Sequence, residues 1–308
     1  MPLSLEVVAE GLGFPEGPVP MADGSLLFVD IKNETLSRLR PGGQPEVVAQ
    51  LPGGPNGVAI GPDGAAYVCN NGRVYSFVPF GAQPGVTVPG PRPDSYQGGS
   101  IQRVDLATGQ VTLLYDSFDG ARLLAPDDIV FDSAGGFWFT DSGFQLPDGS
   151  QHGALYYATV DGKSLVRAAP MAMPNGVGLS PDGKTVYVSD TIFGRLWALD
   201  ITGPGTVAPG ALPVMPGRVV QTLPGFQWLD SLKVEEGGRV CVGTIFNGGI
   251  SVFDPDGTVE HFAVPDLFTT NLCFGGADRM DVWITASSTG KIYKTRWPRP
   301  GLKLAFNA

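Results

Sequence analysis

The stretch PNGVAIGPDGAAYVCNN, residues 55–71, returns further along the chain as PNGVGLSPDGKTVYVSDT, residues 174–191. Each copy consists of a short apolar run, a Pro-Asp-Gly turn and a second run that contains β-branched and aromatic residues. Turn residues of this kind between two such runs are typical of a β-hairpin. The repeated stretch therefore predicts the same hairpin at two distant places in the chain.

Four further segments follow the same pattern. They are PEGPVPMADGSLLFVDI (residues 15–31), PDDIVFDSAGGFWFTDS (126–142), LDSLKVEEGGRVCVGTI (229–245) and TNLCFGGADRMDVWITA (270–286). Another hairpin follows these pairs, as in GRLWALDI at residues 194–201, so each unit supplies about four strands. Four-stranded units repeated at roughly 40–50 residues are typical of propeller blades. We therefore expect an all-β, six-bladed β-propeller that forms a single domain over residues 1–308.

The polar residue near the start of each unit marks the spacing of the blades. These six anchor residues are separated by 40, 71, 48, 55 and 41 residues, and they are Glu16, Asn56, Asp127, Asn175, Asp230 and Asn271. The longest interval contains an insertion rich in proline and glycine at residues 79–99, which we expect to be a long loop over one face. A pair of β-sandwiches or a β-helix would not explain a polar residue at the same place in all six units.

A propeller must also close its ring. We expect the N-terminal run LEVVAEGL, residues 5–12, to pair with the last blades, either near ISVFD at residues 250–254 or with KIYKTRW at residues 291–297. Either pairing would remove two free strand edges. No segment has the pattern of a helix.

Composition excludes several classes of function. The formal net charge is −10 and no basic patch stands out, so nucleic acid is not an expected partner. The three cysteines are odd in number and match no zinc spacing, which indicates buried thiols rather than disulfides. The chain has no signal-peptide pattern at its start and no apolar run long enough to span a membrane. We expect a cytoplasmic protein without a membrane partner, either a monomer or a small homo-oligomer.

The anchor residues predict a cation site. The innermost strand of each blade runs along the central channel, so residues at equivalent positions lie at the same height around it. All six anchors are oxygen donors, and three are carboxylates that would repel one another without a counter-charge. Oxygen ligands favour Ca²⁺, with Mg²⁺ or Mn²⁺ as alternatives, whereas Zn²⁺ usually brings histidine or cysteine. The alternative interpretation is that the anchors cap strand ends or bond to turns.

Four motifs resemble one enzyme family. They are FPEGP (residues 14–18), RLLAPDD (122–128), MPNGVGLSPDG (173–183) and TNLCFGG (270–276). From about Leu5 to Trp297 the chain resembles the SMP-30/gluconolactonase/luciferin-regenerating-enzyme family, which is related to diisopropylfluorophosphatase-like propellers. The resemblance implies a six-bladed propeller, one divalent cation in the central channel, and hydrolysis of lactones or related esters.

The resemblance also implies roles for individual residues. Glu16 and Asn175 match metal ligands, and Asp230 matches a ligand that also serves as general base or nucleophile. Asp127 stands where the family usually has asparagine, which implies either a third carboxylate on the metal or a second candidate for the base. Arg122 matches a substrate-binding arginine loosely. Further candidates for contact with the substrate are Asn56, Asn271, Phe144, Trp228 and Phe246.

Together these features predict a metal-dependent lactonase, or more broadly a carboxylic ester hydrolase. The cation, most readily Ca²⁺ but also Mg²⁺, Mn²⁺ or Zn²⁺, would polarise the carbonyl while Asp230 or Asp127 assists attack by water. Apolar, proline-rich loops favour a less polar lactone or ester. The alternatives are a phosphotriester hydrolase on the same site, a binding propeller with a structural metal and, less well supported, a metal-free propeller like strictosidine synthase.

Overall fold

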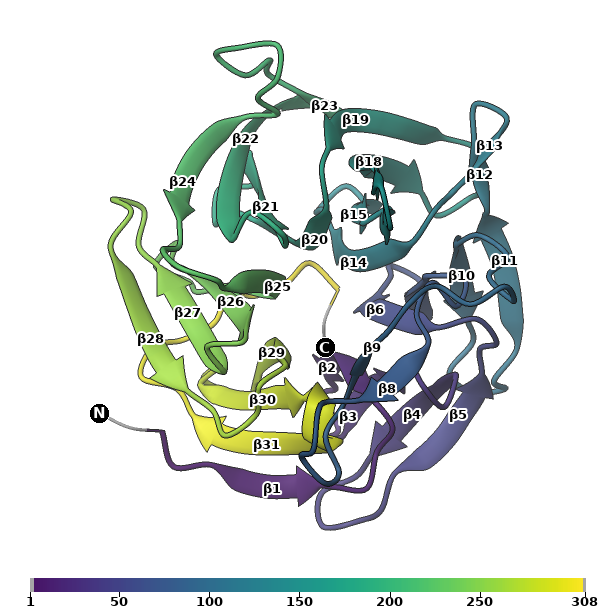
Figure 1. Ribbon diagram of the computed structural model, residues 1–308, viewed down its shortest axis with the longest axis vertical. Coiled ribbons are helices and arrows are strands. Elements are labelled where there is room, and N and C mark those ends of the chain that lie inside the picture. The colour runs from purple at the N-terminus through teal and green to yellow at the C-terminus, as the bar shows by residue number, and fades with distance from the viewer. Residues whose placement is uncertain (1–2, 307–308) are drawn as a thin grey trace.

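The computed structural model describes residues 3–306 and has six antiparallel sheets around one central axis (Figure 1). The first three blades contain β2 (Pro15–Pro20), β3 (Leu26–Asp30), β4 (Thr35–Leu39) and β5 (Glu46–Gln50); β6 (Pro55–Ile60), β7 (Ala66–Asn70), β10 (Ser100–Val104) and β11 (Val111–Tyr115); and β14 (Pro126–Phe131), β15 (Gly136–Asp141), β18 (Gly153–Thr159) and β19 (Leu165–Met171).

The other three blades complete the ring. They contain β20 (Pro174–Leu179), β21 (Thr185–Asp190), β22 (Arg195–Gly203) and β24 (Arg218–Thr222), with the short β23 (Thr206–Val207) beside β22; β25 (Trp228–Val234), β26 (Val240–Ile245), β27 (Gly249–Phe253) and β28 (Val259–Ala263); and β29 (Thr269–Gly275), β30 (Asp281–Ala286), β31 (Lys291–Arg296) and β1 (Glu6–Ala9). The prediction of a six-bladed, all-β propeller is therefore confirmed.

Helical structure is confined to one short turn in the part of the chain that the structure describes. It is the 3₁₀-helix η1 (Ser287–Thr289), and no helix between residues 3 and 306 is long and apolar enough to cross a membrane.

The ring closes by pairing the two ends of the chain. β1 runs antiparallel to β31, with Glu6 opposite Lys294 and Val7 opposite Tyr293. The expected pairing with residues 291–297 is confirmed. The alternative pairing with residues 250–254 is wrong, because β27 already has β26 on one side and β28 on the other.

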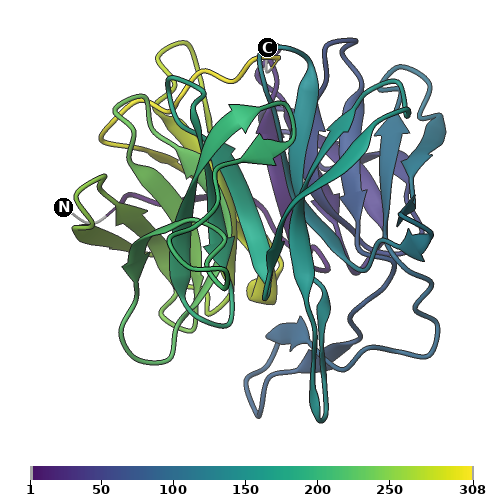
Figure 2. The same ribbon diagram turned by 90° about the horizontal axis from the view of Figure 1, so that it is seen from above.

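Three small hairpins lie outside the blades. They are β8 (Phe77–Pro79) with β9 (Thr87–Pro89), β12 (Ser117–Phe118) with β13 (Ala121–Arg122), and β16 (Phe144–Leu146) with β17 (Gly149–Gln151). The first and the last of these project from the same face of the propeller (Figure 2). The insertion at residues 79–99 does lie over one face, but it is not only a loop, because its first half is part of the β8–β9 hairpin.

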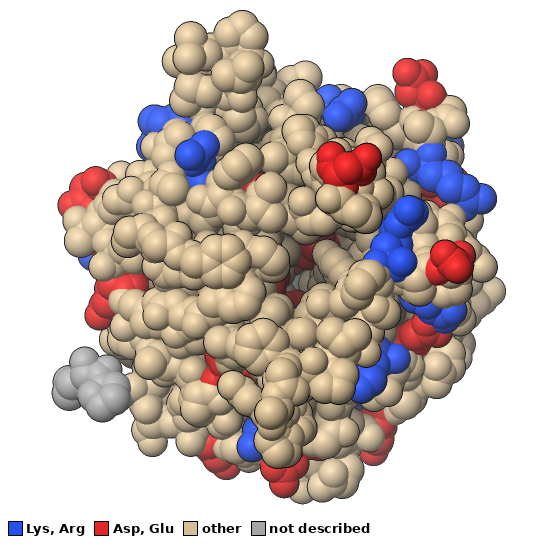
Figure 3. All heavy atoms as spheres, in the orientation of Figure 1, with Lys and Arg blue, Asp and Glu red and all other residues tan. Residues whose placement is uncertain are grey.

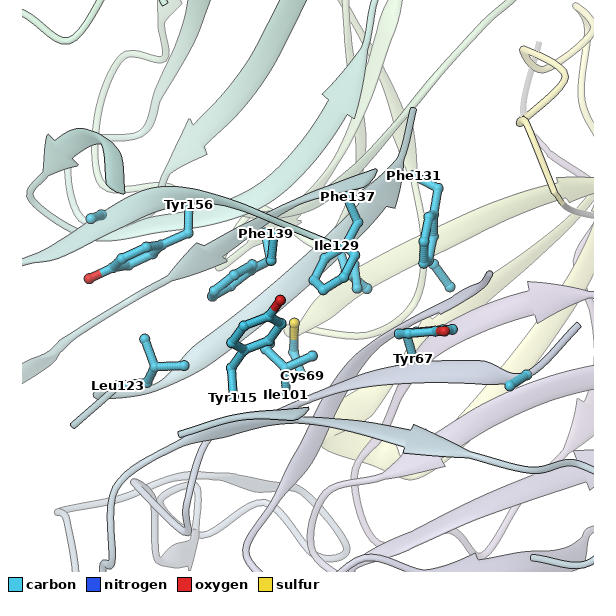
Figure 4. Close-up of a cluster of buried hydrophobic side chains, with 14 residues drawn as sticks. Tyr67, Cys69, Ile101, Tyr115, Leu123, Ile129, Phe131, Phe137, Phe139 and Tyr156 are labelled. Atoms are coloured by element: carbon cyan, nitrogen blue, oxygen red, sulfur yellow. The ribbon is translucent and has the colours of Figure 1, made fainter. Parts of the chain in front are cut away.

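The core lies between neighbouring blades. Between the second and third blades it is largely aromatic: the rings of Tyr67 and Phe131 are 5.1 Å apart, and those of Phe139 and Tyr156 are stacked at 5.2 Å (Figure 4). Cys69 is buried in the same cluster, and all three cysteines are buried and free, as expected.

Candidate active site

Each inner strand changes its register beside its anchor residue. The irregularity falls between Glu16 and Val19 in β2, and at the equivalent place in β6, β14, β20, β25 and β29. A β-bulge of this kind bends the strand and redirects a side chain. The regular alternation of the strand is thus interrupted where the polar residue stands, and apolar packing resumes beyond it.

The glycine after the anchor lets neighbouring inner strands approach closely. A Cβ atom at Gly57 would lie 2.3 Å from the carbonyl oxygen of Asp127, and one at Gly176 would lie 2.5 Å from the amide nitrogen of Leu232. No side chain fits at these distances. The repeated PNG motif therefore requires glycine at this position, because only glycine lets the anchors of adjacent blades come together around the axis.

Hydroxyl groups then tie the blades to one another at the same level. Ser142 donates to the carbonyl oxygen of Pro174 at 2.8 Å, and Ser189 donates to that of Asp230 at 2.6 Å. Ser287 donates to the carbonyl oxygen of Pro15 at 2.6 Å, which joins the last blade to the first. These bonds hold the bulged strand starts in place from outside the ring.

Five of the six anchors meet at the bottom of one cavity of about 340 Å³. They are Glu16, Asn56, Asp127, Asn175 and Asp230. All five side chains are nearly buried. Figure 3 shows carboxylate atoms at the bottom of the opening near the centre of the face that carries the projecting hairpins, with uncharged residues around them.

The sixth anchor, Asn271, does not line this cavity. Its side chain is fully buried, and its Nδ2 atom donates to Glu16 Oε2 at 2.7 Å. The prediction that Asn271 contacts a substrate is therefore corrected: its amide orients Glu16 from behind.

Two carboxylates each keep one oxygen free of hydrogen bonds. Glu16 Oε2 accepts bonds from Asn271 and from the amide of Gly17 at 2.6 Å, and Asp127 Oδ2 lies 2.6 Å from Ser142 Oγ. Glu16 Oε1 and Asp127 Oδ1 are buried, and neither has a hydrogen-bond partner among the described residues. Buried polar atoms normally have a partner, so this pair needs a ligand or a proton.

Burial shifts the three acidic anchors toward their protonated forms. It raises the pKa of Glu16 to about 7, although the hydrogen bonds from Asn271 and from the Gly17 amide oppose the shift. Burial raises the pKa of both Asp127 and Asp230 well above the usual range, and in each case the negative charge of Glu16 adds to the effect. A cation at this point would replace the protons and compensate the repulsion.

The donor set fits a hard cation held partly by amides. Among residues 3–306, no three acidic, histidine or cysteine side chains converge closely enough to enclose an ion by themselves. Asn175 and Asn56 stand among the carboxylates and supply further oxygen atoms. Two unpartnered carboxylate oxygens and neutral amides, without histidine or cysteine, suit Ca²⁺ or Mg²⁺ better than Zn²⁺.

The walls of the cavity are mainly apolar, and many of their side chains are aromatic. The structure places the expected residues Phe144, Trp228 and Phe246 in the wall, and it adds Phe14 and Phe268, which the sequence did not single out. Aromatic residues in this chain are also common in the core between blades, so residue type alone did not separate wall from core.

Tyr75 is a further cavity residue that the sequence did not reveal. Burial, together with the charges of Asp127 and Asp230, raises the pKa of its phenol far above the usual value. The hydroxyl therefore keeps its proton and can act only as a neutral donor or acceptor at neutral pH.

The structure contradicts the expected place of Arg122. This side chain is exposed on β13, donates to the carbonyl oxygen of Gln97 at 2.8 Å and lines a different, polar cavity. Arg92 reaches the candidate site instead, from the insertion, with its guanidinium 4.4 Å from the ring centre of Phe144 and 4.9 Å from that of Tyr96. The charge of Arg92 within the insertion was the one signal that could have identified it.

A charged pair lies deeper in the channel. Lys233 Nζ is 3.3 Å from Asp128 Oδ2, and the aspartate side chain is only 2% exposed. Asp128 Oδ1 also accepts from the amide of Ile129 at 2.9 Å. The LDSLKVE run contains this lysine, but the sequence could not indicate its partner, which is 105 residues away.

Comparison of the sequence with known families identifies one family. The family described as SMP-30/Gluconolactonase/LRE-like region matches residues 14–288. A gluconolactonase from Zymomonas mobilis is 26% identical over 299 residues, which cover 88% of this chain and 76% of that protein. The lactonase drp35 of Staphylococcus saprophyticus is 35% identical over 135 residues, which cover 43% of this chain and 39% of the relative.

Solved structures share the fold over nearly the whole chain. A gluconolactonase from Xanthomonas campestris superposes with a TM-score of 0.74 at 25% identity, covering 96% of this chain and 89% of the other. The calcium-binding protein regucalcin from Agrobacterium tumefaciens has a TM-score of 0.73 at 18% identity, with 99% of each chain covered. By fold, by anchor residues and by this match, the chain belongs to the SMP-30/gluconolactonase/LRE-like family.

Proposed function

We propose that the protein hydrolyses lactones at the anchor residues, with one divalent cation held by Glu16, Asp127, Asn175 and Asp230. The observation that carries this proposal is the pair of buried, unpartnered carboxylate oxygens at the bottom of a largely apolar cavity. The names of the relatives, gluconolactonase and lactonase, support lactones over phosphotriesters as the substrate class.

The cation would come from the hard, oxygen-preferring ions, with Ca²⁺ first to be tested. When bound, such an ion polarises the lactone carbonyl and stabilises the negative charge that develops on its oxygen. Glu16 is held by Asn271 and the Gly17 amide, so its free Oε1 atom has a fixed direction toward this site.

The protein residues would handle the proton. Asp230 accepts a hydrogen bond from the Ser231 amide at 3.0 Å and lines the cavity, so we assign it the removal of a proton from the attacking water. The water oxygen bonds to the acyl carbon, the bond between that carbon and the ring oxygen breaks, and the ring oxygen takes up a proton to give a hydroxy acid. Asp127 is the second candidate for the base, because it lies in the same cavity and its Oδ1 atom is free.

The direct test is proton release from simple δ-lactones by chelated protein reloaded with Ca²⁺, Mg²⁺, Mn²⁺ or Zn²⁺. We expect hydrolysis only after reloading, and its loss in Asp230→Asn. Hydrolysis of phosphotriesters but not of lactones would show that the protein is a phosphotriester hydrolase instead. Absence of any hydrolysis from folded, cation-loaded protein would leave a binding propeller with a structural ion and overturn the proposal.

A further inference from the structure

We infer that the substrate is a lactone with an apolar substituent, such as an aryl group or a short alkyl chain, and not a polyhydroxylated sugar lactone. This inference rests on the proposed function and concerns the upper part of the same cavity. The polar groups gather at the bottom, and the walls above them present hydrocarbon.

The wall is a connected surface of aromatic rings. The ring of Phe246 lies 5.1 Å from that of Trp228 and 5.6 Å from that of Phe268. Phe268 lies 6.5 Å from Phe14, which in turn lies 5.2 Å from Phe77. All five side chains line the cavity. A ligand that extends from the carboxylates toward the opening must pass along this surface.

Few polar side chains stand above the anchors and Thr270. Within the described residues, the other polar side chains of the cavity wall are Tyr75, Arg92, Gln145, Thr191 and Trp228 with its indole N–H. The Nε2 atom of Gln145 points to the sulfur of Met173 at 3.7 Å, and the guanidinium of Arg92 lies over the rings of Phe144 and Tyr96. Several ring hydroxyls of a sugar lactone would lose water here without enough partners in return.

The backbone conformation of Phe246 supports a functional role for its aromatic ring. This residue has a φ angle of +71°, a left-handed conformation that a bulky side chain rarely adopts and that glycine adopts readily. Backbone strain of this kind persists where the surrounding structure enforces it, and often at ligand sites. The turn alone does not require phenylalanine at position 246, whereas the aromatic wall of the cavity does.

The wall is also held from outside. The guanidinium of Arg92 packs against the ring of Phe144, and this cation–π contact fastens the insertion to the β16–β17 hairpin, while a second contact, with Tyr96, lies within the insertion itself. The rings of Tyr96 and Phe144 are themselves in edge contact at 5.6 Å. A wall fixed before binding favours one shape and polarity of substituent.

The experiment compares two δ-lactones with the same ring, one carrying a phenyl or hexyl group and the other the hydroxyls of a hexonic acid. For the wild-type protein we expect kcat/KM to favour the apolar lactone by about 100-fold or more, since each hydroxyl without a partner weakens binding. Equal values, or preference for the sugar lactone, would overturn the inference. If neither lactone is hydrolysed, the proposed function fails instead.

Two variants separate the wall from general packing. Phe246→Gly removes the ring and relieves the strained φ, so we expect an unchanged or higher melting temperature and a loss of most of the preference for the apolar lactone. Phe193→Ala is the matched control, because Phe193 is 50% exposed and does not line the cavity. A preference that survives in Phe246→Gly, or falls equally in both variants, would contradict the assignment.

Discussion

The two ends of the central channel are built by the same six strands and have opposite character. At the end that carries the projecting hairpins, the strands begin with the anchors and open into a cavity of about 340 Å³. At the other end the space is only about 40 Å³, and its lining includes Val19, Val58 and Leu232 together with Leu302 and Leu304 from the C-terminal segment. Each inner strand thus contributes a polar residue to one end of the channel and apolar side chains to the other end.

The bulge explains this division. A regular strand would alternate polar and apolar side chains between its two faces along its whole length. Here the irregularity beside each anchor confines the anchor to the start of the strand, and mainly apolar side chains follow toward the other end. The candidate site therefore depends on the position of the bulge in each inner strand as much as on which residue occupies it.

The largest expected effect comes from the acidic end. Asp230→Asn should lower kcat/KM by roughly 10³-fold, because a neutral amide neither accepts the proton of the attacking water nor holds the cation as a carboxylate does. The melting temperature should not fall, since one member of a repelling buried cluster is neutralised. Steady-state hydrolysis and differential scanning calorimetry on the same samples check both statements. Residual activity within tenfold of wild type would place the base elsewhere.

A second test addresses the boundary between the two ends. Lys233→Met leaves Asp128 as a buried carboxylate without its cation, and we expect a loss of about 3–5 kcal/mol in the free energy of unfolding. The double variant with Asp128→Asn should recover most of this loss. Urea denaturation measures the free energy, and a single-variant loss below about 1 kcal/mol would show that the pair does not stabilise the channel.

The pH dependence of stability tests the cavity end of the channel in the wild-type protein, without any mutation. Because burial raises the pKa of Glu16 from 4.5 to about 7, the folded protein without cation binds more protons than the unfolded chain between these values. Stability of the cation-free protein should therefore fall as the pH rises through this window, by an amount of order a few kcal/mol. Saturating Ca²⁺ should flatten the profile. A melting temperature that is independent of pH in the chelated protein would refute the electrostatic description.

The smallest effect is expected at the apolar end. Leu302 and Leu304 are only partly buried, so their joint replacement by alanine should cost about 1–3 kcal/mol. Activity should stay within about twofold, because neither residue lines the candidate site. A large loss of kcat/KM with little change in unfolding free energy would mean that the two ends are coupled.

The fold and the ring of anchors could be predicted from the sequence, because six strand–turn–strand segments, each with a polar residue near its start, recur at intervals of 40 to 71 residues and are visible without any tertiary information. The role of Asn271 could not, since its equivalence to the other anchors hides the fact that it faces Glu16. The sequence pointed to Arg122 because this arginine begins the RLLAPDD motif, whereas Arg92 belongs to no motif. Which arginine reaches the cavity depends on how the insertion folds against the β16–β17 hairpin.

The proposed chemistry depends on cation binding by the anchors at the cavity end of the channel. Titration calorimetry of chelated protein with Ca²⁺ near pH 6.5, in two buffers of different ionisation enthalpy, tests it most directly. We predict one equivalent bound with release of protons, and loss of binding in Glu16→Gln and Asp230→Asn but not in Phe193→Ala. Absence of binding by the wild-type protein, or binding that persists unchanged in both anchor variants, would contradict the claim.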